Sequence, residues 1–290
     1  MSLLGWIIVF SLLGGVLSVL AASVFLLIND KYQKKLLPHT VSFAIGALLG
    51  AALLALLPHA ILMNENVDFH ELGLTILIGL LGFFLLEKMV LWRHCHSSHC
   101  EVHSPSEIHK SSEVPSPSEV IKSNEIHQSD EPHSSGHSHQ EKDASGILIL
   151  IGDAVHNLVD GVLIAAAFMT DIDLGIVTAL AVAAHEIPQE IGDFAILLNS
   201  GYKRGRALFF NVLASMATLV GALIAYYSLQ SMQHALPYIL AIAASSFIYI
   251  AVADLIPGLH KKTALSETLQ QISLIALGVI TIYWAHSTLH

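Results

Sequence analysis

Two neighbouring apolar segments of this chain carry ionisable and amide side chains deep inside them. The first segment contains Asp153, His156, Asn157 and Asp160, and the second contains His185, Glu186, Gln189, Glu190 and Asp193. Imidazole and carboxylate groups are the ligands that Zn²⁺ and related first-row divalent ions prefer. The residue types therefore predict a metal site built from both segments.

Helical spacing sorts these residues into faces. Side chains four residues apart stack on one face of a helix, with Cβ atoms about 5–6 Å from each other. The pairs with this spacing are His156 with Asp160, His185 with Gln189, and Glu186 with Glu190. Asn157 adjoins His156 and Glu186 adjoins His185, so each helix also offers a neighbouring position. Two such helices facing each other would form a cage of imidazole, carboxylate and amide ligands.

A structural role is the alternative for these polar residues. Isolated His or Asn residues inside a membrane often join helices by hydrogen bonds. Nine polar groups on two consecutive segments are poor links of this kind, because burying charges costs several kcal/mol. We therefore favour a metal pathway. Asp153, Glu190 and Asp193 form a second tier that would line this path or relay protons.

The rest of the chain indicates how these segments are positioned. Of the 290 residues, 54% are hydrophobic and 12% are charged, whereas about 25% is usual for charged residues in soluble domains. Eight stretches approach the roughly 20 apolar residues that a membrane-spanning helix needs. They are Leu3–Ile28, Thr40–Met63, Leu72–Leu91, Ile147–Met169, Leu174–Leu198, Ala207–Leu229, Leu236–Leu259 and Leu269–Trp284. We predict an all-α integral membrane protein with eight transmembrane helices.

Basic residues predict the orientation of these helices. All 13 Lys and Arg residues fall in or beside the connections after spans one, three, five and seven. Cytoplasmic loops carry an excess of Lys and Arg, which places these four connections in the cytoplasm. Both termini are then extracytoplasmic.

A polar segment divides the chain into spans one to three (1–92), a loop (93–146) and spans four to eight (147–290). The loop is rich in Ser, Glu, Pro and His and has few large apolar side chains, so we expect it to be disordered. It repeats SPSE at Ser104–Glu107 and at Ser116–Glu119.

The same loop carries a second group of metal ligands. Half of the 18 histidines of the chain lie in it. Its densest part contains His94, Cys95, His96, His99, Cys100 and His103. Thiolates and imidazoles at short spacing bind zinc or copper, and cytoplasmic thiols stay reduced. We favour weak binding of metal at several places over a plain polar linker and over a Cys95–Cys100 disulfide.

The HNLVDG and HEIPQE segments resemble the ZIP (Zrt/Irt-like protein) family of divalent-metal transporters, in the subgroup with an H-E-x-P-H-E fifth-span motif followed by G-D-F-A. FFLLEK in span three and IYIAVADLIPGL in span seven extend the resemblance over most of the chain. It implies a three-plus-two-plus-three (3+2+3) helix arrangement. It also implies transport of a divalent ion toward the cytosol by alternating exposure of a site between spans four and five.

The resemblance also implies which residues bind the metal. One position would use His156, Asp160, His185 and Gln189, and a second would use Asn157 and Glu186 and share residue 189. The family usually has His or Glu where this chain has Gln189. Because a neutral amide is a weaker ligand and a poor bridge, we expect one firm site and one marginal site.

Two other functional classes compete with transport. His185-Glu186 followed by two residues suggests the H-E-x-x-H motif of an intramembrane zinc metalloprotease, but the required second His is Gln189. A membrane metal sensor without transport would explain the His-rich loop, but it has little need for a ligand cage inside the membrane. The sequence shows no P-loop for a nucleotide and no basic groove with aromatic platforms for nucleic acid.

Several properties stay open at the level of sequence. The transported ion is zinc or a related divalent metal such as Fe, Mn or Cd, because imidazole ligands do not separate them. The expected partners are these ions and the lipid bilayer, and the oligomeric state is open, with a homodimer among the alternatives. A plasma membrane or bacterial inner membrane is the default location, and an intracellular membrane is the alternative.

Overall fold

The computed structural model describes residues 1–63, 68–94, 137–260 and 264–289, and this part of the chain is helical with short turns. Its first half contains α1 (Leu3–Leu12), the π-helical η1 (Leu13–Leu17), α2 (Ser18–Phe25), α3 (Asp30–Gly50), the π-helical η2 (Ala51–Leu56), α4 (Leu57–Leu62) and α5 (Phe69–His94). Its second half contains α6 (His137–Thr170), α7 (Ile172–Asn199), α8 (Arg204–Leu229), η3 (Gln233–Ala235), α9 (Leu236–Tyr249), the π-helical η4 (Ile250–Leu255), α10 (Ile256–Leu259) and α11 (Leu265–Leu289). An all-helical membrane protein was therefore the right fold class.

Seven helical segments among the described residues are long and apolar enough to cross a membrane. They correspond to seven of the eight predicted spans. The predicted fifth span is the 28-residue helix α7, which is not among the seven. Its second half carries the polar run from His185 to Asp193, and this run lowers its apolar character.

Several helices are longer than the apolar segments from which they were predicted. α3 begins at Asp30, well before Thr40, and continues through Pro38. α5 ends at His94 and α6 begins at His137, so both helices enter the segment 93–146 that was predicted as a loop. Hydropathy marks only the part of a helix that suits hydrocarbon. The stretch after Pro132 has no further proline and contains the helix formers Gln140, Glu141 and Lys142.

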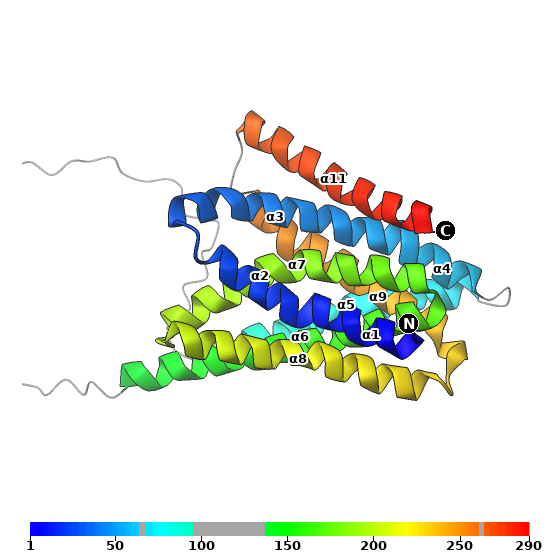
Figure 1. Cartoon of the computed structure of the whole chain (residues 1–290), viewed down its shortest axis with the longest axis horizontal. Coiled ribbons are helices and arrows are strands. Elements are labelled where there is room, and N and C mark those ends of the chain that lie inside the picture. Colours follow the sequence, from blue (N-terminus) through cyan, green and yellow to red (C-terminus); the bar gives the residue numbers. More distant parts are fainter. Residues whose placement is uncertain (64–67, 95–136, 261–263, 290) are drawn as a thin grey trace, which may run out of the picture.

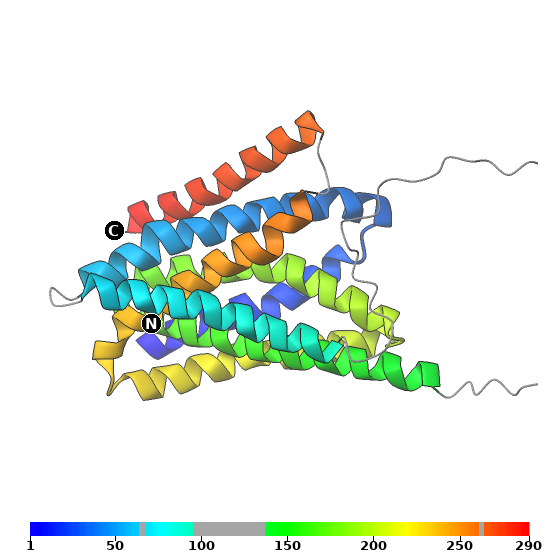
Figure 2. The ribbon, with the colours of Figure 1, turned by 180° about the vertical axis from the view of Figure 1, so that it is seen from behind.

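Figures 1 and 2 show the helices as one bundle, and in Figure 1 α7 lies between α3 on one side and α6 and α8 on the other. α7 contacts α1, α2, α3, α6, α8 and α11. Both termini lie at one end of the bundle, and the α2–α3 and α7–α8 turns lie at the other end (Figure 1). α7 is thus enclosed by other helices, and these shield its polar residues from lipid.

Glycines allow α6 and α8 to approach very closely. A Cβ added at Gly161 of α6 would lie 1.9 Å from the carbonyl oxygen of Thr218. A Cβ added at Gly221 of α8 would lie 2.0 Å from the carbonyl oxygen of Leu158. Small residues at helix contacts permit such close approach in membranes. The two helices therefore form a tight pair, with backbone against backbone.

Three spans contain a π-helical turn. η1 and η2 contact α7, and η4 contacts α3. Wide turns of this kind interrupt α-helices rarely and are frequent at functional sites. In this bundle two of them lie beside the helix that carries most of the polar residues.

Candidate metal centre

A tight turn aligns the polar halves of α6 and α7. α6 ends at Thr170 and α7 begins at Ile172. The side chain of Asp171 caps α7 by accepting hydrogen bonds from the backbone N–H groups of Asp173 (2.8 Å) and Leu174 (3.1 Å). An acceptor at this position satisfies N–H groups that the first turn of a helix leaves unpaired. Because the connection is so short, α6 and α7 run antiparallel, and Asp160 and His185 lie at similar depths.

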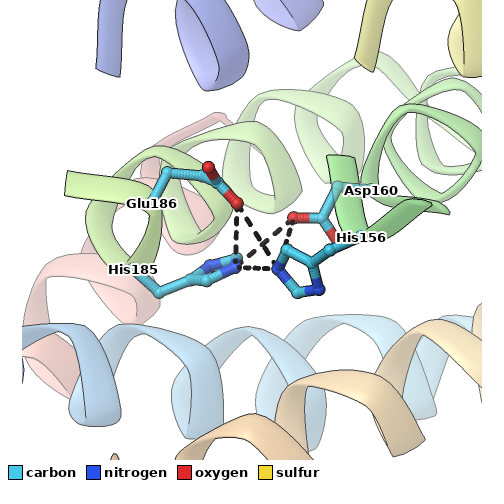
Figure 3. Close-up of side chains that lie close together, drawn as sticks. All are labelled: His156, Asp160, His185 and Glu186. Atoms are coloured by element: carbon cyan, nitrogen blue, oxygen red, sulfur yellow. Dashed lines mark hydrogen bonds and ion pairs between the residues drawn. The ribbon is translucent and has the colours of Figure 1, made fainter. Parts of the chain in front are cut away.

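Four side chains converge between these helices, two from each (Figure 3). The Nε2 atoms of His156 and His185 are 3.3 Å apart. Asp160 Oδ2 lies 3.8 Å from Nε2 of His156 and 3.3 Å from Nε2 of His185. Glu186 Oε1 lies 3.4 Å and 3.5 Å from the same two nitrogens. We call these four residues the α6–α7 cage.

The separations within the cage match those around a tetrahedral ion. Zn²⁺ binds imidazole nitrogen and carboxylate oxygen at about 2.0–2.2 Å, which places neighbouring ligands of a tetrahedron about 3.3–3.6 Å apart. Four of the five separations above fall between 3.3 and 3.5 Å, and the fifth is 3.8 Å. The donors are thus arranged so that one small divalent ion would contact all of them.

Hydrogen bonding fixes the form of one imidazole. Nδ1 of His185 lies 3.2 Å from the carbonyl oxygen of Ala181, one turn earlier in α7. Because a carbonyl oxygen only accepts, Nδ1 carries the proton and donates it. A neutral His185 then presents an unprotonated Nε2 to the cage, and this is the form that binds metals.

Three of the four residues of the cage are buried. His185 and Asp160 are 1% exposed and Glu186 is 0% exposed, whereas the His156 side chain is 18% exposed. Apart from the contacts with the two imidazoles, the Asp160 and Glu186 carboxylates have no hydrogen-bond partner within the described ranges. Burying an ionised carboxylate without such partners is costly, and a bound cation would offset that cost.

The predicted division into two metal positions differs from this geometry. Glu186, which the resemblance placed in the second position, faces both imidazoles of the first. Gln189, which it placed in the first, is half-buried, and its side chain makes no hydrogen bond to any residue that the structure describes. Glu186 thus stands in the cage where Gln189 was expected.

Asn157 joins helices in this structure. Its Nδ2 donates to Asp153, at 3.1 Å from the carbonyl oxygen and 2.8 Å from Oδ1. Its Oδ1 accepts a hydrogen bond of 2.7 Å from Oγ1 of Thr218 in α8. The amide that was predicted to bind a second metal therefore links α6 to α8.

Two of the second-tier residues, Asp153 and Glu190, form a group with Glu186. Asp153, Glu186 and Glu190 each present a carboxylate oxygen within 4.8 Å of the others. Asp193, the third member of that tier, is half-buried. Glu190 Oε2 accepts a hydrogen bond of 2.9 Å from Nδ2 of Asn211 in α8.

Asn211 and Thr218 were not among the predicted site residues. They lie seven residues apart on α8, which places them on one face of that helix. Polar residues at this spacing inside an otherwise apolar span would have indicated a polar contact with α6 and α7.

Of the predicted metal-binding residues of the loop, one lies within the described part of the chain. His94 is the last residue of α5. Cys95, His96, His99, Cys100 and His103 lie outside the described residues.

Replacing Thr218 by Val is expected to destabilise the α6–α8 pair. The change keeps the shape of the side chain but leaves the buried Oδ1 of Asn157 without its donor, at a cost of about 1–3 kcal/mol. Thermal unfolding of the purified protein in detergent would measure this loss. Thr75→Val is the matched control, because the Thr75 hydroxyl bonds only the Glu71 carbonyl of its own helix. Equal melting temperatures for the two variants would contradict this account of Thr218.

Comparison with known proteins matches this chain to zinc transporters. The profile of the ZIP zinc transporter family matches residues 2–284. Zinc transporter ZIP13 of Gallus gallus is 31% identical over 272 residues, which cover 87% of this chain and 74% of that protein. Zinc transporter ZIP13 of Mus musculus is 30% identical over 252 residues, covering 83% of this chain and 67% of that protein. The Zinc transporter ZIP13 homolog of Drosophila melanogaster is 29% identical over 310 residues and covers 93% of this chain.

Proposed function

Because this chain belongs to the ZIP zinc transporter family and moves metal ions across a membrane, we propose that Zn²⁺ is its substrate and that the α6–α7 cage binds it during transport. The single observation that carries the proposal is the set of 3.3–3.8 Å separations among the four donors. Two imidazoles and two carboxylates suit Zn²⁺ and its first-row neighbours, so Fe²⁺ and Mn²⁺, and the heavier Cd²⁺, are the expected competitors.

The proposed topology has eight spans in a 3+2+3 arrangement, with α7 as the fifth. A helix of 28 residues is about 42 Å long at 1.5 Å per residue, enough to cross a hydrocarbon core of about 30 Å. Its contacts with six other helices support a place inside the bundle. Both termini then face the extracytoplasmic side of a plasma or bacterial inner membrane, and the ion moves toward the basic, cytosolic end.

The loop between α5 and α6 would bind the same ions weakly on the cytosolic side. Its cysteines and its first histidines follow α5 directly in the sequence, and α5 ends at the end of the bundle opposite the termini. Ligands at that end would receive ions as they leave the bundle.

The two other functional classes find no support in the relatives, which are named as zinc transporters. A protease of the H-E-x-x-H type needs its Glu as a free base beside the metal. Here Glu186 Oε1 is one of the four converging donors.

Zinc uptake by proteoliposomes tests the proposal. Purified protein would be placed in vesicles that enclose a fluorescent zinc indicator, and zinc would be added outside. We expect a saturable rise in fluorescence that empty vesicles lack, and a slower rise when Cd²⁺ competes. A folded protein that binds zinc without moving it would refute transport and favour the sensor, and a protease assay would then follow.

A further inference from the structure

A groove lies between α2, α7 and α8, at the end of the bundle that holds the α2–α3 and α7–α8 turns (Figure 1). Its volume is about 630 Å³, within the range of about 300–1,000 Å³ that is usual for ligand sites. None of the four residues of the α6–α7 cage lines it, so it is a separate feature of the bundle. We call it the α2–α7–α8 groove.

The walls of the groove are mostly apolar. They are formed by Leu26 and Leu27 directly after α2, by Phe194 and Leu198 of α7, and by Leu208 of α8. Leu27 is 79% exposed, so this wall faces the surroundings of the bundle. Lipid tails are as apolar as leucine, and an acyl chain therefore suits these walls.

Two polar side chains in the same walls bond to the protein itself. The Ser23 hydroxyl donates a 2.7 Å hydrogen bond to the carbonyl oxygen of Leu20. Nε2 of Gln33 donates to the carbonyl oxygens of Leu26 (3.1 Å) and Ile28 (2.7 Å). The hydrogen-bond donors of both side chains are thus used, and this part of the groove stays suited to an apolar occupant.

One end of the groove is polar. Asn199 is the last residue of α7 and Arg204 is the first residue of α8, and both line the groove. One turn further into the bundle the lining residues are apolar, with Ala195 before Asn199 and Leu208 after Arg204. The groove is therefore polar at the end of the bundle and apolar toward its middle. A phospholipid has the same order of headgroup and acyl chain.

The polar end carries unpaired positive charge. Arg204 is exposed and forms no ion pair with any residue that the structure describes. Lys203 and Arg206 lie beside it in the sequence, the segment 199–206 contains no acidic residue, and none lines the groove. A guanidinium group binds phosphate oxygens through two parallel hydrogen bonds. The charge at this end thus complements an anionic headgroup.

The backbone beside Arg204 offers further donors. No side chain caps α8, and the backbone N–H groups of Arg204 and Gly205 have no hydrogen-bond partner within the described ranges. A Cβ added at Gly205 would meet no atom within 4 Å, so the space beside this backbone is open. N–H groups in the first turn of a helix are suited to a phosphate oxygen.

We infer that the α2–α7–α8 groove binds an anionic phospholipid of the cytosolic leaflet, with its phosphate at Arg204 and an acyl chain along the apolar walls. Basic pockets between membrane helices on the cytoplasmic side bind anionic headgroups, and the cytosolic leaflet is the negatively charged one. The choice of leaflet rests on the proposed topology, which makes this end of the bundle cytosolic. A choline headgroup suits the groove less well, because it adds a cation beside three basic residues.

Native mass spectrometry of the full-length protein, released from detergent micelles, tests the inference by counting the lipids bound to each chain. The probes are phosphatidylglycerol and phosphatidylcholine with identical acyl chains. We expect the parent to bind its first phosphatidylglycerol more tightly than phosphatidylcholine. Arg204→Gln should bind phosphatidylglycerol roughly five-fold more weakly, which corresponds to the contribution of one basic residue near an anionic surface.

Arg206→Gln is the matched control. It removes the same charge from the same turn of α8, but Arg206 does not line the groove, so this variant should keep the preference for phosphatidylglycerol. Ala195→Trp places a large side chain in the groove from α7 and should weaken the binding of both lipids.

Three outcomes would overturn the inference. The first is equal affinity of the parent for the two lipids, and the second is an equal loss in Arg204→Gln and Arg206→Gln. The third is displacement of phosphatidylglycerol by inorganic phosphate at a similar concentration, which would indicate a site for a free anion. Zinc uptake does not enter these comparisons, so each of these outcomes would leave the proposed function standing.

Discussion

Replacing His185 by Ala is expected to reduce zinc uptake to the level of empty vesicles. The imidazole is 1% exposed and lies within 3.3–3.5 Å of the other three donor atoms, so its loss leaves a buried gap at the centre of the cage. The two carboxylates and His156 then hold an ion with three ligands instead of four. His156→Ala should have the same effect, because it removes the corresponding ligand from α6. Uptake would be measured in the vesicle assay at several zinc concentrations.

Replacing a histidine outside the cage provides the control for this experiment. His234 lies in η3 and is exposed, so His234→Ala should leave uptake unchanged. Size-exclusion chromatography and helical circular dichroism of each variant would show that it is folded. Uptake at the parent rate by folded His185→Ala would place the ion pathway elsewhere in the bundle.

Replacing Gly221 by Ala should cause a large loss of stability. The added Cβ would lie 2.0 Å from the carbonyl oxygen of Leu158, more than an ångström inside normal contact. Because the obstacle is backbone, the helices themselves must separate. Overpacking of this kind usually costs about 1–3 kcal/mol or more. Separation would also stretch the Thr218–Asn157 hydrogen bond in the same interface. We expect a markedly lower melting temperature and a lower yield of folded protein.

Gly82 provides the control for this experiment. A Cβ at Gly82 of α5 would meet no atom within 4 Å, so Gly82→Ala should be neutral or gain a few tenths of a kcal/mol from helix propensity. Comparable melting temperatures for Gly82→Ala and Gly221→Ala would show that the α6–α8 contact is not rigid. Gly161→Ala should behave like Gly221→Ala, since its Cβ would meet the carbonyl oxygen of Thr218 at 1.9 Å.

The sequence was sufficient to predict the all-helical fold class and the four residues that converge between α6 and α7. Every member of the α6–α7 cage was among the predicted ligands, because ionisable residues inside apolar segments are conspicuous. Hydropathy located the spans but not the helix ends. A hydropathy pattern detects only apolar helix, so it could not reveal that polar residues such as Gln140 and Glu141 are also helical. For this reason α6 begins earlier than expected.

The spacing of residues along one helix could not predict which side chains meet across two helices. Spacing along α7 places His185 and Gln189 on one face, but it does not say which of Glu186 and Gln189 meets α6. The contribution of α8 was missed for a similar reason. Asn211 and Thr218 are single neutral residues in an apolar span, and their partners Glu190 and Asn157 lie far away in the chain.

The division of the cage between two helices has a mechanical consequence. α6 and α7 each supply one imidazole and one carboxylate, and α6 is fastened to α8 through its glycine contact. A slide of α7 along α6 by a single residue, about 1.5 Å, would lengthen several of the separations on which four-fold coordination depends. An ion bound by ligands from both helices would therefore resist such a slide, and a slide of α7 along α6 would in turn weaken the coordination of the ion.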